Sequence, residues 1–243
     1  MNKKLLIIPI LLLAFVMSAC GFSINVDLDQ GSGVVITETR PVSNFDRVSL
    51  SGIGDVTLVQ SSSESLKIEA EDNVVPKITT EVRDGTLYIG FERKAVLPTK
   101  PIKFYLTMKT IHALESKGVS NVKAKEVQTD QLDISISGTG NINIENLDAG
   151  SLQISISGAG NFTSGGRVDR QEINLSGAGN FDGEDLQCKE ANVTITGLGK
   201  VTLWVTDNLD VTISGTGGVD YYGSPQISQH ISGLGKLNHR GNK

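Results

Sequence analysis

Residues 132–142 have the sequence LDISISGTGNI, and the fold class can be inferred from this stretch. Aliphatic residues occupy alternate positions up to Ile136, a Gly-x-Gly tripeptide follows, and the alternation resumes at Ile142. A period of two is typical of a β-strand with one buried face. Glycine permits a sharp corner or a close backbone approach because it has no Cβ. The stretch therefore predicts a strand, a tight corner and a second strand.

The same unit recurs through the second half of the chain. Successive copies lie 18 to 20 residues apart, with first glycines at Gly138, Gly158, Gly177, Gly197, Gly215 and Gly233. The position two residues before each glycine is aliphatic in every copy: Ile136, Ile156, Leu175, Ile195, Ile213 and Ile231. One further copy begins at Gly52. Internal repeats of this length are typical of a solenoid.

Two architectures can use this unit, a meander of antiparallel hairpins and a parallel β-helix. In a β-helix each position lies about 4.8 Å from the same position of the next coil. Isoleucine then stacks on isoleucine, Phe162 on Phe181, and Asn141 on Asn161 and Asn180, as in-register stacking favours. A meander gives no reason for so constant a register. We therefore expect an all-β, single-stranded parallel β-helix with coils of 18–20 residues, right-handed by the general preference of crossovers.

The first residues predict a secreted protein. Lys3 and Lys4 precede an apolar run over residues 5–16, and Ser18-Ala19 precede Cys20. This is the pattern of a secretory signal peptide, and the run is too short for a membrane span of about 20 residues. The segment resembles a bacterial lipobox, which implies a signal over 1–19 and a lipid on Cys20. The alternative is an ordinary signal peptide that ends at a cysteine.

The remaining chain divides into a tether and one domain. We expect residues 20–32 to be the tether and residues 33–243 to form the β-helix. Within it, residues 33–110 are expected to form irregular N-terminal coils, and residues 111–243 the regular repeats.

The charge distribution argues against a nucleic-acid partner. The chain has 22 Lys and Arg against 27 Asp and Glu, and loss of Lys3 and Lys4 with the signal leaves 20 basic residues. No cluster of five or more basic residues is present, whereas phosphate binding needs concentrated positive charge. Aromatic residues make up only 5% of the chain, which also disfavours base stacking.

No residue pattern predicts catalysis, a metal site or a cofactor. Strand sequence follows the Gly-x-Gly copies, whereas a dinucleotide fingerprint needs a third glycine and a helix. His112, His230 and His239 lack zinc-site spacing. Acidic residues cluster at Asp182, Glu184 and Asp185. They are compatible with weak calcium binding, although a solvated acidic turn is the simpler interpretation.

Three other features have a structural and a functional interpretation. Cys188 occupies a position that is small or β-branched in other coils, so we expect a buried thiol. Trp204 and Tyr222 occupy a position that holds leucine in other coils, which favours packing. The alternative is that they form, with Tyr221, an aromatic patch that binds a sugar ring. The last coil carries positive charge that opposes end-to-end pairing of strand edges, or alternatively binds anionic lipid or polysaccharide: Lys236, His239, Arg240 and Lys243.

The sequence from about Gly31 to Lys243 resembles a known bacterial family. PVSNFDRV at residues 41–48 and SGIGDV at residues 51–56 are similar to the start of the auto-transporter adhesin, head GIN domain family, and the Ser-Gly-x-Gly repeats resemble its C-terminal half. The resemblance implies a right-handed parallel β-helix like that of pectin-lyase-type proteins, and a role in adhesion. It brings no catalytic residues.

The function expected from these observations is that of a lipid-anchored, non-catalytic binding or adhesion module of the cell envelope. Its partners would be the membrane, through the lipid on Cys20, and a surface polysaccharide or protein. In a diderm host the outer membrane or cell surface is the expected location. Two alternatives stay open: a polysaccharide lyase or hydrolase on a pectin-lyase-like β-helix, and a self-assembling structural envelope protein.

Overall fold

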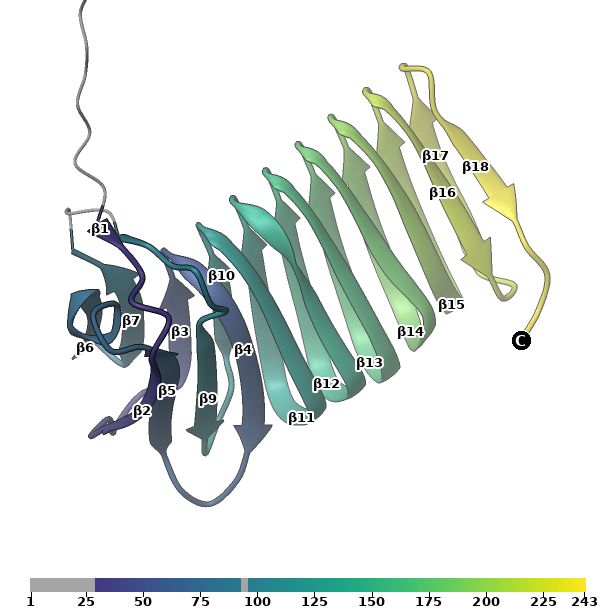
Figure 1. The fold of residues 1–243 in the computed structure, drawn as a ribbon. Helices are drawn as coiled ribbons and strands as arrows, with labels where there is room; N and C mark the ends of the chain where they lie inside the picture. Colours follow the sequence, from purple (N-terminus) through teal and green to yellow (C-terminus); the bar gives the residue numbers. More distant parts are fainter. Residues whose placement is uncertain (1–28, 93–95) are drawn as a thin grey trace, which may run out of the picture.

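The computed structural model describes residues 29–92 and 96–243, which form an all-β solenoid (Figure 1). A 16-stranded sheet includes nearly all of the strands, and β1 and β8 form a separate pair. Cys20 lies outside the described residues. The elements are β1 (Asp29–Gln30), β2 (Val35–Arg40), β3 (Arg47–Leu50), β4 (Ile53–Gln60), β5 (Ser65–Glu71), the 3-10 turn η1 (Val75–Lys77), β6 (Ile78–Arg83), β7 (Thr86–Phe91), β8 (Val96–Leu97), β9 (Lys103–Met108), β10 (Ala113–Ser116), β11 (Val119–Ile136), β12 (Thr139–Ile156), β13 (Ala159–Leu175), β14 (Ala178–Ile195), β15 (Leu198–Ile213), β16 (Thr216–Tyr222), β17 (Gln226–Ile231) and β18 (Lys236–His239).

Strands β11 to β15 each run around most of one coil and pair in parallel with the next (Figure 1). The register places Ile134 on Ile154, and Phe162 on Phe181. The two phenylalanine rings stack with centroids 5.5 Å apart and an interplanar angle of 11°. The parallel β-solenoid predicted from the repeats is therefore confirmed.

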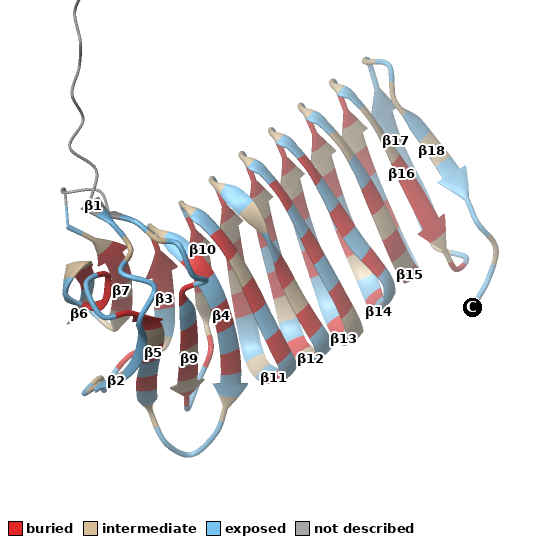
Figure 2. Cartoon of the chain, in the orientation of Figure 1, coloured by how far each residue is buried: buried red, intermediate tan, exposed pale blue. Residues whose placement is uncertain are grey.

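The interior of each coil is filled by the alternating aliphatic residues. Buried and exposed residues alternate as stripes along the strands in Figure 2. In β12 the buried set consists of Ile142, Ile144, Leu147, Ala149, Leu152, Ile154 and Ile156. Because neighbouring coils repeat this set, the buried residues form one continuous core along the axis.

The Gly-x-Gly corners need glycine because backbones approach closely there. A Cβ added to Gly158 would collide with the carbonyl oxygen of Gly138 in the previous coil. The amides around the corner are satisfied by that coil: Ser157 N–H and Gly158 N–H both donate to the carbonyl of Ile136, at 3.0 and 3.1 Å. Steric contact, rather than a left-handed φ, therefore explains this glycine.

The N-terminal region combines solenoid strands with antiparallel excursions. Strands β3 and β4 stack in parallel on β10 and β11 and so continue the solenoid. By contrast, β2 pairs with β5, β5 with β9, and β6 with β7 in antiparallel fashion. Asp84 and Gly85, with φ of 50° and 73°, form the turn between β6 and β7. The sequence predicted irregular coils in this region but not the three antiparallel pairings.

A buried carboxylate fixes the chain near β1. Glu71 is 1% exposed and accepts hydrogen bonds from the Thr99 hydroxyl and from the N–H groups of Gly33, Thr99 and Lys100. The Thr99 hydroxyl, more than the backbone donors, holds the pKa of Glu71 below its usual range, against the opposing effect of burial. Residues 29–30 of the expected tether form β1, which pairs with β8. Among residues 29–92 and 96–243, no helix is long and apolar enough to cross a bilayer.

The last coil is tied to the one before it by a second buried carboxylate. Asp220 is 3% exposed and binds Lys200 Nζ and Arg240 Nη2, each at 2.7 Å, and Asn238 Nδ2 at 2.9 Å. Burial alone would raise the pKa of Asp220, but these hydrogen bonds outweigh it and hold the pKa at about 2. Part of the basic charge of the last coil therefore has an internal partner.

Candidate functional site

Two concavities on the surface of the solenoid are lined by rows of polar side chains. One, here called the charged groove, has a volume of ≈ 770 Å³, and its lining extends from Gln60 and His112 to Lys189 and Thr206. The other, here called the asparagine groove, has a volume of ≈ 830 Å³ and lies on the first strand segment after each corner. The side chains of the asparagine groove form hydrogen bonds with one another, whereas those of the charged groove include ion pairs and exposed amides.

The asparagine groove is built on a chain of side-chain hydrogen bonds. Each asparagine Nδ2 donates to the Oδ1 of the previous coil, from Asn180 through Asn161 and Asn141 to Asn121, at 2.8 to 3.0 Å. Asp55 accepts the last bond at 2.8 Å. The predicted stacking of Asn141, Asn161 and Asn180 is thus confirmed. Because the amides bind one another, we interpret this row as support for the coil stack.

The charged groove contains a line of outward side chains, here called the central row. The parallel register joins its members from coil to coil: Gln128, Asp148, Arg167, Gln187, Trp204 and Tyr222. The first four line the groove itself, and the two aromatic residues continue the row beyond it. At about 4.8 Å for each coil, the row is about 24 Å long.

The charged side chains of the groove form ion pairs between coils. Arg167 binds both carboxylate oxygens of Asp148, at 3.2 and 2.7 Å. This hydrogen bonding lowers the pKa of Asp148 and raises that of Arg167. Lys189 Nζ lies 2.7 Å from Asp169. With Asp130, the groove lining contains three carboxylates against two permanent cations.

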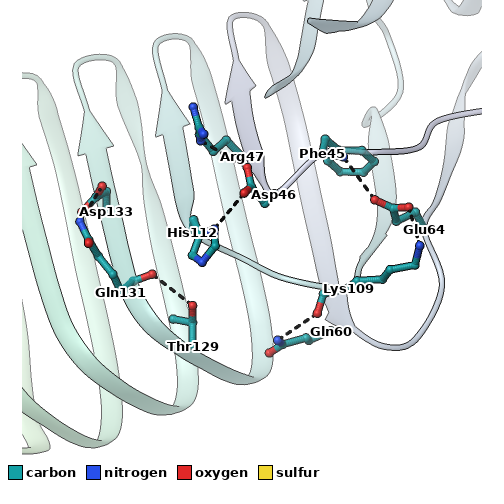
Figure 3. Close-up of polar contacts among 10 residues, drawn as sticks. All are labelled: Phe45, Asp46, Arg47, Gln60, Glu64, Lys109, His112, Thr129, Gln131 and Asp133. Atoms are coloured by element: carbon teal, nitrogen blue, oxygen red, sulfur yellow. Dashed lines mark hydrogen bonds and ion pairs between the residues drawn. The ribbon is translucent and has the colours of Figure 1, made fainter. Parts of the chain in front are cut away.

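One end of the groove contains a histidine–aspartate pair (Figure 3). His112 Nδ1 lies 2.9 Å from Asp46 Oδ2, and Arg47 Nε lies 3.3 Å from Asp46 Oδ1. Gln60 bridges this end by donating to the carbonyls of Lys109 and Gln128. None of the hydrogen bonds described for residues 29–92 and 96–243 joins His112 to a hydroxyl or thiol nucleophile. The pair links the residues that directly precede β3 and β10.

The other two histidines lie far from this pair. His230 is exposed on β17. His239 stacks on Tyr221, with ring centroids 4.9 Å apart, and its Nε2 lies 2.9 Å from the carbonyl of Gly223. No cluster of three or more metal-ligating side chains occurs in the part of the chain that the structure describes.

The acidic cluster near residue 184 is occupied by a cation from the chain itself. Lys243 Nζ lies 2.8 Å from Asp185 Oδ1 and 3.6 Å from Glu184 Oε1. It also donates to the Glu184 carbonyl at 2.8 Å. This arrangement fits a solvated acidic turn with a lysine partner. No sequence pattern predicted that Lys243 would reach these carboxylates.

Cys188 is a buried residue of the core, as expected. Burial raises the pKa of its thiol to about 12, with a smaller contribution from Asp207. The thiolate is the reactive form of cysteine. At neutral pH this thiol therefore stays protonated and unreactive.

The aromatic patch differs from the one proposed from the sequence. Tyr221 is buried and faces His239, so it does not belong to the patch. Trp204 and Tyr222 are half-buried neighbours in register on the outer surface. Lys243 Nζ lies 4.9 Å from the Tyr222 ring centroid and 5.7 Å from that of Trp204. The outer patch thus consists of two rings at the end of the central row.

Comparisons with known proteins agree with this architecture. A model of the family described as "Putative auto-transporter adhesin, head GIN domain" matches residues 44–225. A crystal structure from Bacteroides fragilis NCTC 9343, described as "a putative adhesin", is 29% identical, with a TM-score of 0.83 over 86% of this chain and 99% of that one.

Two solved structures from Parabacteroides share the fold at lower identity. A "putative lipid binding protein" of P. distasonis ATCC 8503 is 24% identical, with a TM-score of 0.71 over 86% of this chain and 98% of that one. A "putative adhesin" of P. merdae ATCC 43184 is 21% identical, with a TM-score of 0.63 and the same coverage. A search of curated proteins finds no match. Because the family match spans most of the sequence, the chain belongs to the auto-transporter adhesin, head GIN domain family.

Proposed function

We propose that the protein is a non-catalytic adhesion module which is held on the bacterial cell envelope by a lipid on Cys20 and binds an extended surface polymer. The observation that carries the proposal is the central row, which aligns six outward side chains, four of them in a groove of ≈ 770 Å³. A row of contacts at a constant step suits a ligand that is itself a linear repeat.

Rigidity of the frame supports binding by many weak contacts. The row residues stand on consecutive coils whose backbones are hydrogen-bonded in register. Ligand binding therefore orders few groups on the protein side, and this reduces the entropic cost of association. Family membership points to the same use, because the family is described as adhesins.

The anchor is proposed from the first twenty residues. A lipid chain contributes about 0.8 kcal/mol for each buried methylene, and two or more chains give stable attachment. Residue 21, directly after Cys20, is a glycine rather than an acidic residue. In a diderm host we take this to favour export to the outer membrane.

The state of the ionisable groups favours binding over catalysis. Asp148 and Asp169 are paired with Arg167 and Lys189, and the Cys188 thiol stays protonated at neutral pH. A lyase or hydrolase on this fold would need a free base or acid converging on one sugar unit.

The test uses bacteria that display the full chain. The Cys20→Ser variant should move from the membrane fraction to the soluble fraction, and mass spectrometry of the wild type should find acyl chains on Cys20. Cells with Gln128→Arg and Gln187→Arg should lose adhesion to surface material of related bacteria. Asn143→Arg with Thr163→Arg, in the asparagine groove, is the matched control and should retain it. Release of cleaved polymer by the wild type, or equal adhesion by all variants, would contradict the proposal.

A further inference from the structure

The aromatic pair lies where the charged groove ends. Gln187 pairs with Trp204 and Trp204 with Tyr222 in the parallel register, so the rings follow the polar part of the central row directly. Both rings are half-buried and face outward from β15 and β16. The same row therefore offers amides and charges along most of its length and two ring faces at one end.

We infer that the charged groove binds a neutral glycan of pyranose units laid along the solenoid axis, with one sugar packed on Trp204 and Tyr222. This inference rests on the proposed function and names the class of polymer. A pyranose ring has an apolar C–H face and a rim of hydroxyl groups. Aromatic faces bind the first, and amides and carboxylates bind the second.

The charge of the groove selects a neutral polymer. Its three carboxylates, Asp130, Asp148 and Asp169, exceed its two permanent cations, and the cations are both engaged in ion pairs. A polyanion such as a nucleic acid or a uronic-acid polymer would meet no free positive row. The amides of Gln128 and Gln187 are exposed and can donate to and accept from hydroxyl groups.

The geometry favours a glycan over a polypeptide strand. An added strand needs a free sheet edge with unpaired backbone groups. The groove instead lies on the face of coils β11 to β15, whose strands are paired with their neighbours. The step of about 4.8 Å between row residues is close to the length that one pyranose adds to an extended glycan.

Lys243 covers the faces of the Trp204 and Tyr222 rings. Its Nζ lies 4.9 Å from the Tyr222 centroid and is held by Asp185 at 2.8 Å. A sugar that packs on these rings has to displace the ammonium group. Removal of the side chain should therefore strengthen binding, whereas removal of either ring should weaken it.

The experiment is a calorimetric titration of the purified full-length Cys20→Ser chain with neutral hexasaccharides. The probes are β-1,4-linked hexamers of glucose, mannose, xylose and N-acetylglucosamine, with polygalacturonate as the charged comparison. We expect at least one neutral hexamer to bind. Trp204→Gln and Tyr222→Gln, which place a glutamine like Gln187 in the row, should each lower its affinity about tenfold. Lys243→Ala should raise it.

Tyr88→Ala is the matched control, because Arg83 covers that ring at 4.8 Å on another face. Its affinity should equal that of the wild type, and circular dichroism should show folded protein for every variant. Three results would overturn the inference: no binding of any neutral hexamer, tighter binding of polygalacturonate, or affinity unchanged in both ring variants. If cell adhesion still depends on Gln128 and Gln187 in that case, the adhesion proposal stands and only the glycan is rejected.

Discussion

The regular coils β11 to β15 and the N-terminal region of β2 to β9 both bury an apolar core under a β-sheet, but their strands pair differently. In the regular coils each buried position meets its equivalent in the next coil, with parallel pairing throughout. The N-terminal region mixes parallel stacking with antiparallel pairs at β2–β5, β5–β9 and β6–β7. Figure 1 shows the change from evenly spaced coils to the less regular strands of the N-terminal region.

The difference shows what each arrangement supplies. Repetition places outward residues in straight rows, and one of these rows forms the charged groove. The antiparallel strands instead cover one end of the stack. At the other end, strand β17 of the last coil is exposed along its whole length (Figure 2). We propose that the regular coils carry binding, whereas the N-terminal strands cover one end of the core.

The largest expected effect comes from breaking the aromatic stack in the regular coils. Phe162→Ala removes a fully buried ring that packs on Phe181 at 5.5 Å, and should lower the free energy of unfolding by about 3–5 kcal/mol. Chemical denaturation measures the loss. In a solenoid each coil contacts only its neighbours, so hydrogen exchange should accelerate in β12 to β14 more than in β5 to β9. Uniform acceleration would show that the two regions are not separable.

A corner glycine tests the close packing of backbones. Gly158→Ala forces a Cβ against the carbonyl of Gly138 and should cost about 2–3 kcal/mol. The control is Gly218→Ala in β16, where the nearest atom to an added Cβ is 3.6 Å away. That variant should unfold within about 0.5 kcal/mol of the wild type. Equal losses at both sites would refute the steric explanation.

Replacement of the buried Gln171 by an apolar residue should stabilise the regular coils. Gln171 is 1% exposed, and neither of its amide atoms has a hydrogen-bond partner. Equivalent positions in other coils hold the apolar residues Leu132, Leu152, Ala191 and Leu209. Gln171→Leu should therefore raise the free energy of unfolding by about 1–2 kcal/mol. Thermal melting would show a higher midpoint, whereas a lower one would mean that the amide has a role in this interior.

Acid should destabilise the N-terminal region around Glu71 before it destabilises the regular coils. The pKa of the Glu71 carboxyl is lowered from 4.5 by the Thr99 hydroxyl and the backbone donors. Its contribution to stability is therefore complete above pH 4.5 and is lost as the pH falls through the lowered value. Hydrogen exchange of residues 31–33 and 97–100 should accelerate on acidification before that of β12. Glu71→Gln should reduce this pH dependence, and an unchanged profile would contradict the assignment.

The smallest expected effect is that the Cys188 thiol does not react in the folded protein. Cys188 has a pKa of about 12 and is 1% exposed, so iodoacetamide should not alkylate it in the folded Cys20→Ser chain at pH 8. Denaturation should expose it to full alkylation. Fast labelling under native conditions would mean that β14 opens readily, contrary to the close packing of the coils.

The sequence predicted the regular coils well because their information is local and repeated. The Gly-x-Gly spacing, the aliphatic positions and the asparagine stack follow from a period of two and a coil of 18–20 residues. The buried Cys188 follows from the same alignment. These features need no knowledge of distant contacts.

Other features depend on contacts that no repeat encodes. The antiparallel pair β2–β5 joins strands about thirty residues apart whose patterns fit several partners. Tyr221 and Tyr222 are adjacent in β16, so one side chain faces the core and the other faces outward, and the sequence alone does not say which. Lys243 lies after the last strand, β18, and reaches the rings of Trp204 and Tyr222. The charged groove depends on the register between coils, which aligns the residues of the central row.

The division between a binding stack and a protective end is tested most directly by one NMR titration. The 15N-labelled Cys20→Ser chain would be titrated with the neutral hexasaccharide that binds it. We expect amide shift changes along Gln128, Asp148, Arg167, Gln187, Trp204 and Tyr222, with none in β2, β5, β6 or β7. Shift changes centred on those N-terminal strands or on the asparagine groove would contradict the account.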